Sequence, residues 1–521
     1  MQFKNLISRF ILIYVFLLTL SPSFAQKKEV QVSAEASMKQ VVRDGQKVVR
    51  YMQNVLIVHE GAKMNCDSAY VLKKTNIIKA FGRVKIVKEE TTITGDYLHY
   101  DGNTSVGEIT GKEVKLVQKD ATLTTDKVFF NSKSNTAYYT SNGILVNNDN
   151  NLVSKRGYYI SNQKKYVFAG NVQMFSKDGS LYTDSLEYKS DLDIAYFYGP
   201  TRIYNKENYV YCKKGWYDRR NEQSNFSINA YMKNKSQRLF GQNIFYNKKD
   251  KYSKLDGDVA IYDSTRNVAI FGGEANYWDV HGVAKVTKNP LVMLFDKNDT
   301  LYLKSDTLLL QTFKDNSLPD SLYRIVRAIG ESKFYRKDVQ GKSDTLIYNT
   351  KDSTISMISN PVLWNENYQI TADQIKAFTT TGNRISRMEF EGNPMMSSNE
   401  EKTWFNQIKG KSMTASFTEG KLRKLDVFGN GQTVYFLRDK GAIVTVNKVE
   451  SSDLTITVKN NKLSRILFKA KPISTLYPIE KVDAEEITLK GFKWLNEYRP
   501  KSKLDIIPKG TRTDILFPKP I

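Results

Sequence analysis

Apolar and polar residues alternate with a period of two along much of the chain, for example over residues 84–87 and 122–130. This alternation is typical of β-strands that have one buried and one solvated face. Turn-forming residues separate the alternating segments, as at Asp101-Gly102-Asn103 and Lys177-Asp178-Gly179. No helical period of useful length precedes residue 480. The pattern therefore predicts an all-β protein.

A structural unit recurs about every 29 residues. It contains the phrase Asp-x-Leu-x-Tyr, which ends at Tyr100 in its clearest copy. A fixed period of roughly 20–50 residues indicates stacked units, each of which relies on its neighbours to close a core. We therefore predict an elongated β-solenoid of stacked repeats. The positions equivalent to Tyr100 are Val71, Phe130, Tyr159, Tyr188, Tyr217, Tyr246, Tyr277, Leu310, Tyr348 and Ala377.

The first 25 residues have the composition of a secretory signal peptide. A basic start with Lys4 and Arg9 precedes an apolar run over residues 10–20, and Ser23-Phe24-Ala25 forms a small-x-small cleavage site. The apolar run is shorter than the roughly 20 residues that a membrane-spanning helix needs. We therefore expect an exported protein whose signal peptide, residues 1–25, is removed.

Interruptions of the repeat divide the rest of the chain. The spacing stretches near residues 316–320, which have the composition of a loop. The final residues contain several prolines and are expected to form an extended or loosely docked basic tail. We predict regular repeats over residues 26–313, an irregular connection over residues 314–331, a second set of repeats over residues 332–479, and the tail over residues 480–521.

The formal net charge of +23 bears on the ligand. An exported protein this basic attracts polyanions, such as the phosphates of a lipid head group or an acidic polysaccharide. The export signal and the lack of a nucleic-acid-binding motif argue against nucleic acid. A surface that simply carries surplus lysine is the alternative explanation.

Residues with the spacing of a catalytic or metal site are missing from the sequence. The three histidines, His59, His99 and His281, do not form a metal-binding pattern, and no nucleophile elbow or phosphate loop is found. We therefore expect no catalytic residue, no metal and no cofactor, and hence a protein that is not an enzyme. Cys66 and Cys212 occupy equivalent positions five periods apart, too far for a disulfide, and are expected to be free thiols.

Aspartates recur at one place in the unit. Because a catalytic pair is unique whereas these carboxylates are copied, we expect them to accept hydrogen bonds from backbone N–H groups where the strand bends. They are Asp67, Asp96, Asp126, Asp184, Asp306, Asp344 and Asp373.

The repeated phrases resemble those of the OstA-like family over roughly residues 30–400. The clearest matches are Ala169-Gly170-Asn171-Val172, the following residues 181–188, and residues 95–100. Members of this family are periplasmic lipopolysaccharide-transport proteins and the N-terminal domain of the outer-membrane translocon. The resemblance implies a jellyroll whose two facing sheets hold acyl chains, a periplasmic location, and binding of the lipid A part of lipopolysaccharide during outer-membrane assembly.

The resemblance also implies partners. Other Lpt-type envelope proteins would add strands to the two end edges of the sheets, and the same edges allow head-to-tail association of copies of this chain. The alternative function is a secreted β-solenoid with a filled core and a structural or polyanion-binding role. The candidate lipid contacts all occupy the same face of their strands, as set by the repeated phrase. In the alternative function, these side chains would instead fill the core. They are Leu98, Tyr100, Val128, Phe130, Leu186 and Tyr188.

Overall fold

A computed structural model describes most of the chain. The described residues are 30–43, 46–147, 150–205, 208–296, 299–315, 321–380, 384–401, 403–419, 421–459 and 462–516. They form β-strands and short 3-10 helices, which confirms the predicted all-β class. The predicted signal peptide lies outside them. Among these residues, no helix has the length and apolar character that crossing a membrane requires.

The chain divides into two compact units, Met1–Lys206 (unit 1) and Glu207–Ile521 (unit 2). This boundary differs from the predicted break at residues 314–331. Most of that predicted irregular connection is strand, because β24 runs to Lys314 and β25 begins at Leu322. The two strands form one long hairpin, in which Phe313 pairs with Tyr323.

The strands of unit 1 follow one another with short turns. They are β1 (Gln31–Ser33), β2 (Ala36–Arg43), β3 (Gln46–His59), β4 (Ala62–Leu72), β5 (Ile77–Lys88), β6 (Thr91–Asp101), β7 (Val106–Gln118), β8 (Ala121–Asn131), β9 (Thr136–Tyr139), β10 (Gly143–Asn147), β11 (Asn150–Ser154), β12 (Arg156–Ile160), β13 (Lys165–Ser176), β14 (Gly179–Lys189) and β15 (Ile194–Asn205), with the 3-10 helix η1 (Ser161–Gln163) between β12 and β13.

Unit 2 continues the pattern of antiparallel strands. They are β16 (Asn208–Asp218), β17 (Gln223–Lys233), β18 (Gln237–Asn247), β19 (Tyr252–Asp263), β20 (Val268–Trp278), β21 (Val283–Thr287), β22 (Leu291–Phe295), β23 (Thr300–Lys304), β24 (Thr307–Lys314), β25 (Leu322–Arg336), β26 (Val339–Asn349), β27 (Thr354–Ile358), β28 (Val362–Asn365), β29 (Tyr368–Thr371), β30 (Gln374–Thr380), β31 (Arg384–Glu391), β32 (Met395–Glu401), β33 (Trp404–Lys409), β34 (Ser412–Thr418), β35 (Lys421–Asp439), β36 (Ala442–Lys459), β37 (Lys462–Lys469) and β38 (Ile473–Pro478). Its 3-10 helices are η2 (Asp279–His281), η3 (Ile479–Lys481), η4 (Asn496–Tyr498), η5 (Lys503–Asp505) and η6 (Thr513–Leu516).

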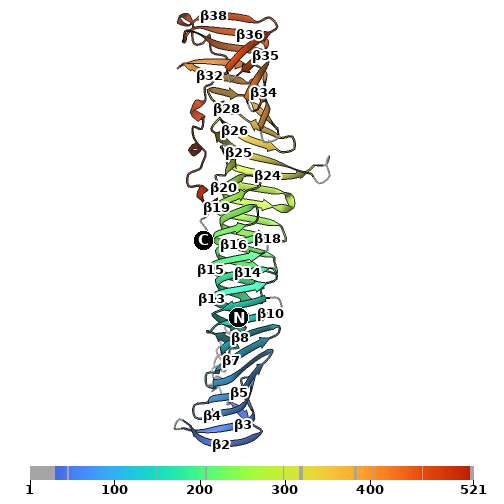
Figure 1. Ribbon diagram of the computed structural model, residues 1–521, viewed down its shortest axis with the longest axis vertical. Coiled ribbons are helices and arrows are strands. Elements are labelled where there is room, and N and C mark those ends of the chain that lie inside the picture. The colour runs from blue at the N-terminus through green and yellow to red at the C-terminus, as the bar shows by residue number, and fades with distance from the viewer. Residues whose placement is uncertain are drawn as a thin grey trace, which may run out of the picture. The chain divides into compact units, whose positions relative to one another are not determined.

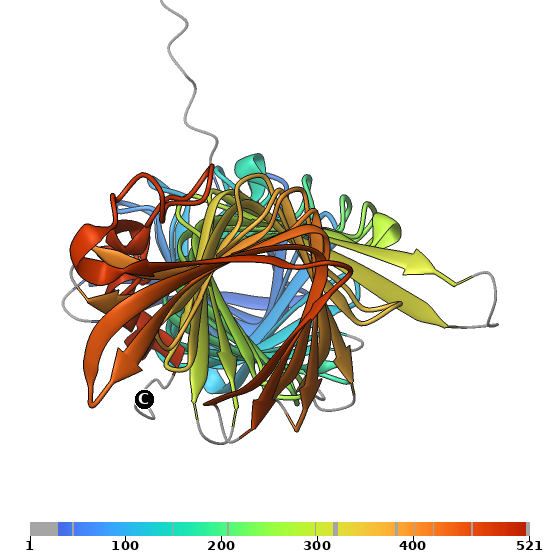
Figure 2. The same cartoon turned by 90° about the horizontal axis from the view of Figure 1, so that it is seen from above.

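Each unit is a stack of antiparallel strands that extends along the stacking direction (Figure 1). The long strands bend near their middle, so that the two halves of each strand belong to two facing sheets (Figure 2). We call the sheet that carries the repeated tyrosine position sheet A, and the other sheet B. In β6, for example, Tyr97–Asp101 pairs in sheet A and Thr91–Thr94 in sheet B. This arrangement is the predicted jellyroll.

The bend coincides with the recurrent aspartate. The pairing register shifts between Thr94 and Tyr97, on either side of Asp96. There the backbone N–H of Lys112 donates to Asp96 Oδ2 at 2.8 Å, which confirms the corner role predicted for this aspartate. At five of the seven recurrent aspartates, a glycine farther along the chain lies directly beneath the carboxylate, so that a Cβ atom would overlap it. These aspartate–glycine pairs are Asp67–Gly82, Asp96–Gly111, Asp184–Gly199, Asp306–Gly330 and Asp373–Gly392.

The inner faces of the sheets are apolar. In unit 1, a cluster of buried side chains runs from Val55 to Tyr139 and fills the space between sheets A and B. The free thiols lie at equivalent points of the inner face, Cys66 on β4 and Cys212 on β16, and both are buried. The predicted absence of a disulfide between them is confirmed.

The C-terminal segment is extended, one of the two forms predicted for the tail, and it is docked on unit 2. It runs as an extended segment with 3-10 turns beside the sheet (Figure 1, red). Ile487 and Leu489 join one buried cluster with Met395 and Val434. Ile506 is completely buried in a second cluster. Buried apolar side chains near both ends therefore fix this segment.

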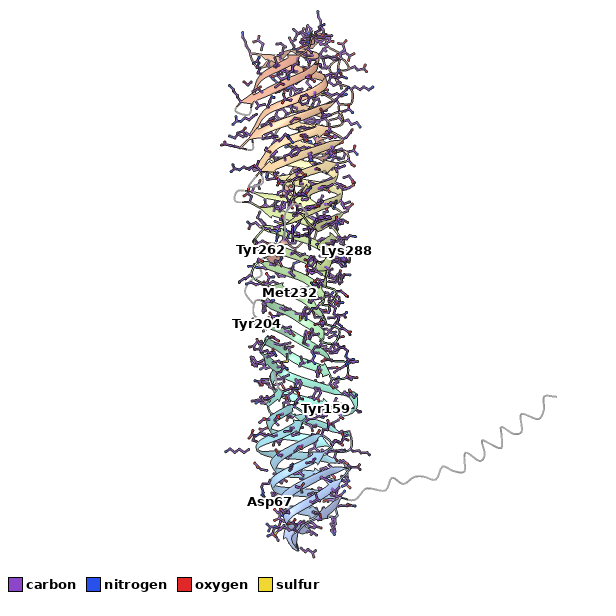
Figure 3. The ribbon with its side chains drawn as sticks, turned by 90° about the vertical axis from the view of Figure 1, so that its right-hand side faces the viewer. Asp67, Tyr159, Tyr204, Met232, Tyr262 and Lys288 are labelled. Carbon is purple, nitrogen blue, oxygen red and sulfur yellow. The ribbon has the colours of Figure 1, made fainter. Side chains whose placement is uncertain are left out.

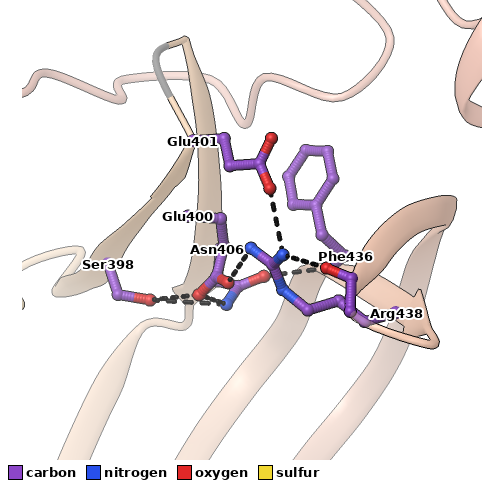
Figure 4. A network of polar contacts seen from close by, with 7 residues as sticks. Ser398, Glu400, Glu401, Asn406, Phe436 and Arg438 are labelled. Carbon is purple, nitrogen blue, oxygen red and sulfur yellow. Dashed lines mark hydrogen bonds and ion pairs between the residues drawn. The ribbon is translucent and has the colours of Figure 1, made fainter.

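Polar side chains tie three of the last strands of unit 2 together (Figure 4). The Asn406 amide donates to Glu400 Oε1 at 2.5 Å, and Asn406 Oδ1 accepts from the Phe436 N–H at 2.9 Å. Arg438 donates to Glu401 at 3.0 Å and to Glu400 at 3.4 Å. These bonds join β32, β33 and β35.

We expect Gly199→Ala to lower the thermal unfolding midpoint of the protein. Gly199 has a φ of +85° and lies beneath the Asp184 carboxylate. Alanine adds left-handed backbone strain of about 1–2 kcal/mol and overpacking of about 1–3 kcal/mol. Gly441→Ala is the matched control, because Gly441 has a φ of +91° but no atom near a Cβ position. Equal shifts for the two variants in circular dichroism melts would show that the aspartate contact is unimportant.

We expect the two thiols to react slowly with iodoacetamide in the native protein at pH 8. Burial raises the pKa of Cys66 and of Cys212 to about 11. Because the thiolate is the reactive form, both groups remain protonated until the pH approaches that value. Modification followed by peptide mass spectrometry should therefore accelerate between pH 8 and 11, and it should be fast at pH 8 in guanidinium chloride. Equally fast modification of the native protein at pH 8 would contradict this expectation.

Candidate functional site

All six predicted lipid-contact residues lie on the inner face of sheet A in unit 1. Cross-strand pairing places them in two adjacent rows. One row contains Leu98, Val128 and Leu186, and the other contains Tyr100, Phe130 and Tyr188. The shared strand phase of the repeated phrase therefore corresponds to one continuous surface.

Sheet B presents an aliphatic row opposite these residues. Consecutive cross-strand partners bring one inward-facing residue of each strand next to the following one. The row contains Ile57, Met64, Ile86, Ile93, Leu116, Leu123, Leu145, Leu152, Met174, Leu181 and Ile203. The interior of unit 1 is thus lined by alkyl groups on one side and by alkyl and aromatic groups on the other.

The part of this interior next to β3–β8 is closed. Leu98, Tyr100 and Val128 have no exposed surface. His59 of sheet B shares a hydrogen bond of 2.5 Å with the Tyr100 hydroxyl of sheet A, and that hydroxyl lies 2.8 Å from Ser132 Oγ. These bonds hold the two sheets together at the side opposite the corner.

The inward-facing tyrosines farther along unit 1 are only half-buried. Tyr159, Tyr166 and Tyr188 follow one another in the row, with ring centroids 4.7 and 6.3 Å apart. The Gln118 side chain reaches from sheet B to the Tyr159 and Tyr166 hydroxyls at 3.4 and 3.2 Å. Burial raises the pKa of Tyr166 to about 12, so this hydroxyl is a neutral hydrogen-bonding group at physiological pH.

In unit 2, the same repeat position is open to solvent although it faces inward. A Cβ atom on Gly272 of sheet B would point at the side chain of Val286 of sheet A. These two residues therefore lie between the sheets and show which face is the inner one. Tyr217, Tyr246 and Tyr277 are nevertheless 43, 39 and 42% exposed. The two sheets therefore do not close over these rings.

Apolar side chains surround the open tyrosines. Phe226, Ile244 and Leu255 of sheet A are buried nearer the corner. On sheet B, half-buried inward-facing residues continue the surface; Met232, one of them, is labelled in Figure 3. They are Met232, Leu239, Ile261 and Ile270. Sequence reasoning identified Tyr217, Tyr246 and Tyr277 as copies of Tyr100 but did not select them as lipid contacts, because the phrase does not reveal which copies remain open.

This arrangement suits an apolar ligand better than bond-making chemistry. The surfaces offer alkyl and aromatic groups with tyrosine hydroxyls at the open side, which is the composition of a site for acyl chains. Within the described ranges, no three His, Cys, Asp or Glu side chains gather as a metal site would require.

Comparisons with known proteins agree with the resemblance. A family model described as "OstA-like protein" matches residues 27–180 and 170–242. A second, described as "LptA/(LptD N-terminal domain) LPS transport protein", matches residues 297–383. No curated protein sequence matches the chain.

One similar solved structure is LptH of Pseudomonas aeruginosa, the LptA homologous periplasmic component of the conserved lipopolysaccharide transport device. It shares 18% identity over 26% of this chain and 79% of that chain, with a TM-score of 0.15. The family matches support a protein of the lipopolysaccharide-transport type. Residues 27–242 of this chain thus match the OstA-like family, and residues 297–383 match the lipopolysaccharide-transport family. Both matches confirm the resemblance that the repeated phrases suggested.

Proposed function

We propose that this protein is a periplasmic, non-enzymatic carrier or bridge for lipopolysaccharide, which holds the acyl chains of lipid A between its two sheets during outer-membrane assembly. The exposure of Tyr217, Tyr246 and Tyr277 on an inward-facing surface carries this proposal. A filled solenoid core has no reason to leave large inward-facing side chains in contact with solvent, whereas a lipid can cover them. Both matched families support the same function.

Cations lie close to the open tyrosines. Arg219 and Arg220 are on the turn after β16, and Lys248 and Lys249 are on the turn after β18. Lys249 Nζ donates to the Arg220 carbonyl at 3.1 Å, so the two turns are adjacent. Such groups form strong hydrogen bonds with phosphates. Acyl chains between the sheets and phosphates at these turns would match the two halves of lipid A.

The six predicted lipid-contact residues differ in how deeply they are buried. Tyr188 is half-buried and continues the row of Tyr159 and Tyr166, so we propose that it contacts lipid together with its neighbour Leu186. Leu98, Tyr100, Val128 and Phe130 belong to the packed cluster of unit 1. Lipid would reach these four only if the two sheets separate there.

A photoreactive amino acid at Tyr217, Tyr246 or Tyr277 should form adducts with lipopolysaccharide in cells, and one at Leu186 should form fewer. Tyr158 is the matched control, because it is a tyrosine of similar exposure, 38%, on the outer face of sheet A. Leu98→Ala should mainly destabilise the protein, by about 2–5 kcal/mol, and a crosslinker at Leu98 should form no lipid adduct. The proposal fails if none of the three inner tyrosines yields an adduct. Equal adducts at Tyr158 would favour a polyanion-binding outer surface instead.

We also propose that end strands join this protein to a second copy or to another Lpt-type envelope protein. At the end of unit 2, β37 and β38 each pair with β36, and in the described residues neither has a second partner strand. Ile473 and Leu476 of β38 are 71 and 60% exposed. An apolar strand with a free edge is a template for strand addition.

Replacing both Ile473 and Leu476 by aspartate should weaken this association roughly tenfold, or about 1.4 kcal/mol. The charges oppose burial in an interface, yet both side chains are already solvated in the isolated chain, so the melting temperature should stay unchanged. Val280→Asp alters an exposed apolar residue on another turn of unit 2 and serves as the control. Sedimentation velocity at increasing concentration measures the effect. Unchanged self-association, together with unchanged crosslinking to envelope partners in cells, would exclude this edge.

A further inference from the structure

The outer face of sheet B in unit 2 is apolar. Cross-strand partners place Phe271 and Leu291 side by side on this face, opposite in direction to the inward-facing Ile270 and Val292. Farther along, Trp364 and Val434 also point outward, and all four outward residues are buried. An outer sheet surface of this kind needs a cover, and the C-terminal segment, residues 479–507, lies on it (Figures 1 and 2).

Two buried glutamines bind the main chain of this segment. Gln407 donates to the Ile487 carbonyl at 3.0 Å and accepts from the Leu489 N–H at 2.9 Å. Gln369 donates to the Lys493 carbonyl at 2.7 Å and accepts from the Leu495 N–H at 2.7 Å. Each amide thus pairs with a carbonyl and with the N–H two residues later, as a neighbouring β-strand would.

Lysines on the same face bind further carbonyl groups of the segment. Lys448, Lys409 and Lys304 donate to the carbonyls of Glu486, Lys490 and Asp505 at 3.0, 2.6 and 2.8 Å. Between the last two, Arg499 Nε donates to the Gln340 side chain at 2.8 Å, and Lys342 lies 4.0 Å from the centre of the Tyr498 ring.

Apolar side chains anchor the segment between these polar contacts. Phe492 and Trp494 pack on Phe405, with ring centroids 5.0 and 4.9 Å apart. Ile506 has no exposed surface and lies among Ala260, Ala269, Phe271, Leu291 and Met293.

We propose that this outer face is a docking surface for an extended polypeptide and that residues 479–507 occupy it as a clasp. In a stack of repeats, each strand contacts only its neighbours, so the strands can open locally and independently. The clasp contacts strands from β19 to β36, which are many strands apart in the stack. It therefore suppresses local opening over this part of unit 2. This inference does not depend on which ligand lies between the sheets.

Hydrogen–deuterium exchange of the full-length protein tests the clasp. In the wild type, the amides of Leu489 and Leu495 should be protected, because each donates to a buried glutamine. Ile506→Ala should accelerate exchange in β20 and β22 by about tenfold or more if it releases about 1.4 kcal/mol of docking free energy. Leu504→Ala is the matched control, because Leu504 belongs to the same segment but is 74% exposed.

Gln369→Met supplies a milder second variant that keeps side-chain length while removing both main-chain bonds. It should accelerate exchange at Leu495 and in β28 and β29. Exchange in residues 48–147 should be unchanged in every variant, because these residues belong to unit 1 and the clasp lies on unit 2. The proposal is overturned if residues 480–507 exchange in the wild type as fast as an unfolded peptide. It is equally overturned if Ile506→Ala and Leu504→Ala give the same exchange in β20 and β22.

Discussion

The close approach of an aspartate carboxylate to a glycine of the next strand is the contact on which the rest of this structure depends. It marks the bend in five of the repeats, for example at Asp67–Gly82 and Asp184–Gly199. Because side chains alternate along a strand, a bend displaced by one residue would turn the inner face outward. The constant position of the corner is what allows Leu98 and Leu186, 88 residues apart in the sequence, to lie in one row.

The same repeated position has different environments in different repeats. Tyr100 is sealed by His59 and Ser132, whereas Tyr217 and Tyr246 face inward and remain exposed. The difference comes from the residues that reach across from the facing sheet and not from the phrase itself. The closed repeats form a packed core, whereas the open ones leave inward-facing rings uncovered.

The C-terminal segment covers the outer face of sheet B in unit 2, and this face is therefore apolar. A solvated outer face gives strict alternation, but a strand covered on both faces is a continuous apolar run. Residues 291–295 and 362–364 are such runs, and both lie under the segment or beside it. Each follows an Asn-Pro pair, as does Met395-Met396, so a sequence signal for the cover was present at three places.

The sequence alone determined the class and the repeat, because period-two alternation and a fixed spacing are local properties of the chain. It also determined that Cys66 and Cys212 are free, since equivalent positions in distant repeats cannot meet. Only the tertiary structure decided which copies of the tyrosine stay open, because that depends on side chains such as Gln118 that arrive from the facing sheet. It alone showed that the tail is anchored, since Gln369 and Gln407 meet partners 80 or more residues away in the chain, and the apolar runs do not reveal which segment covers them.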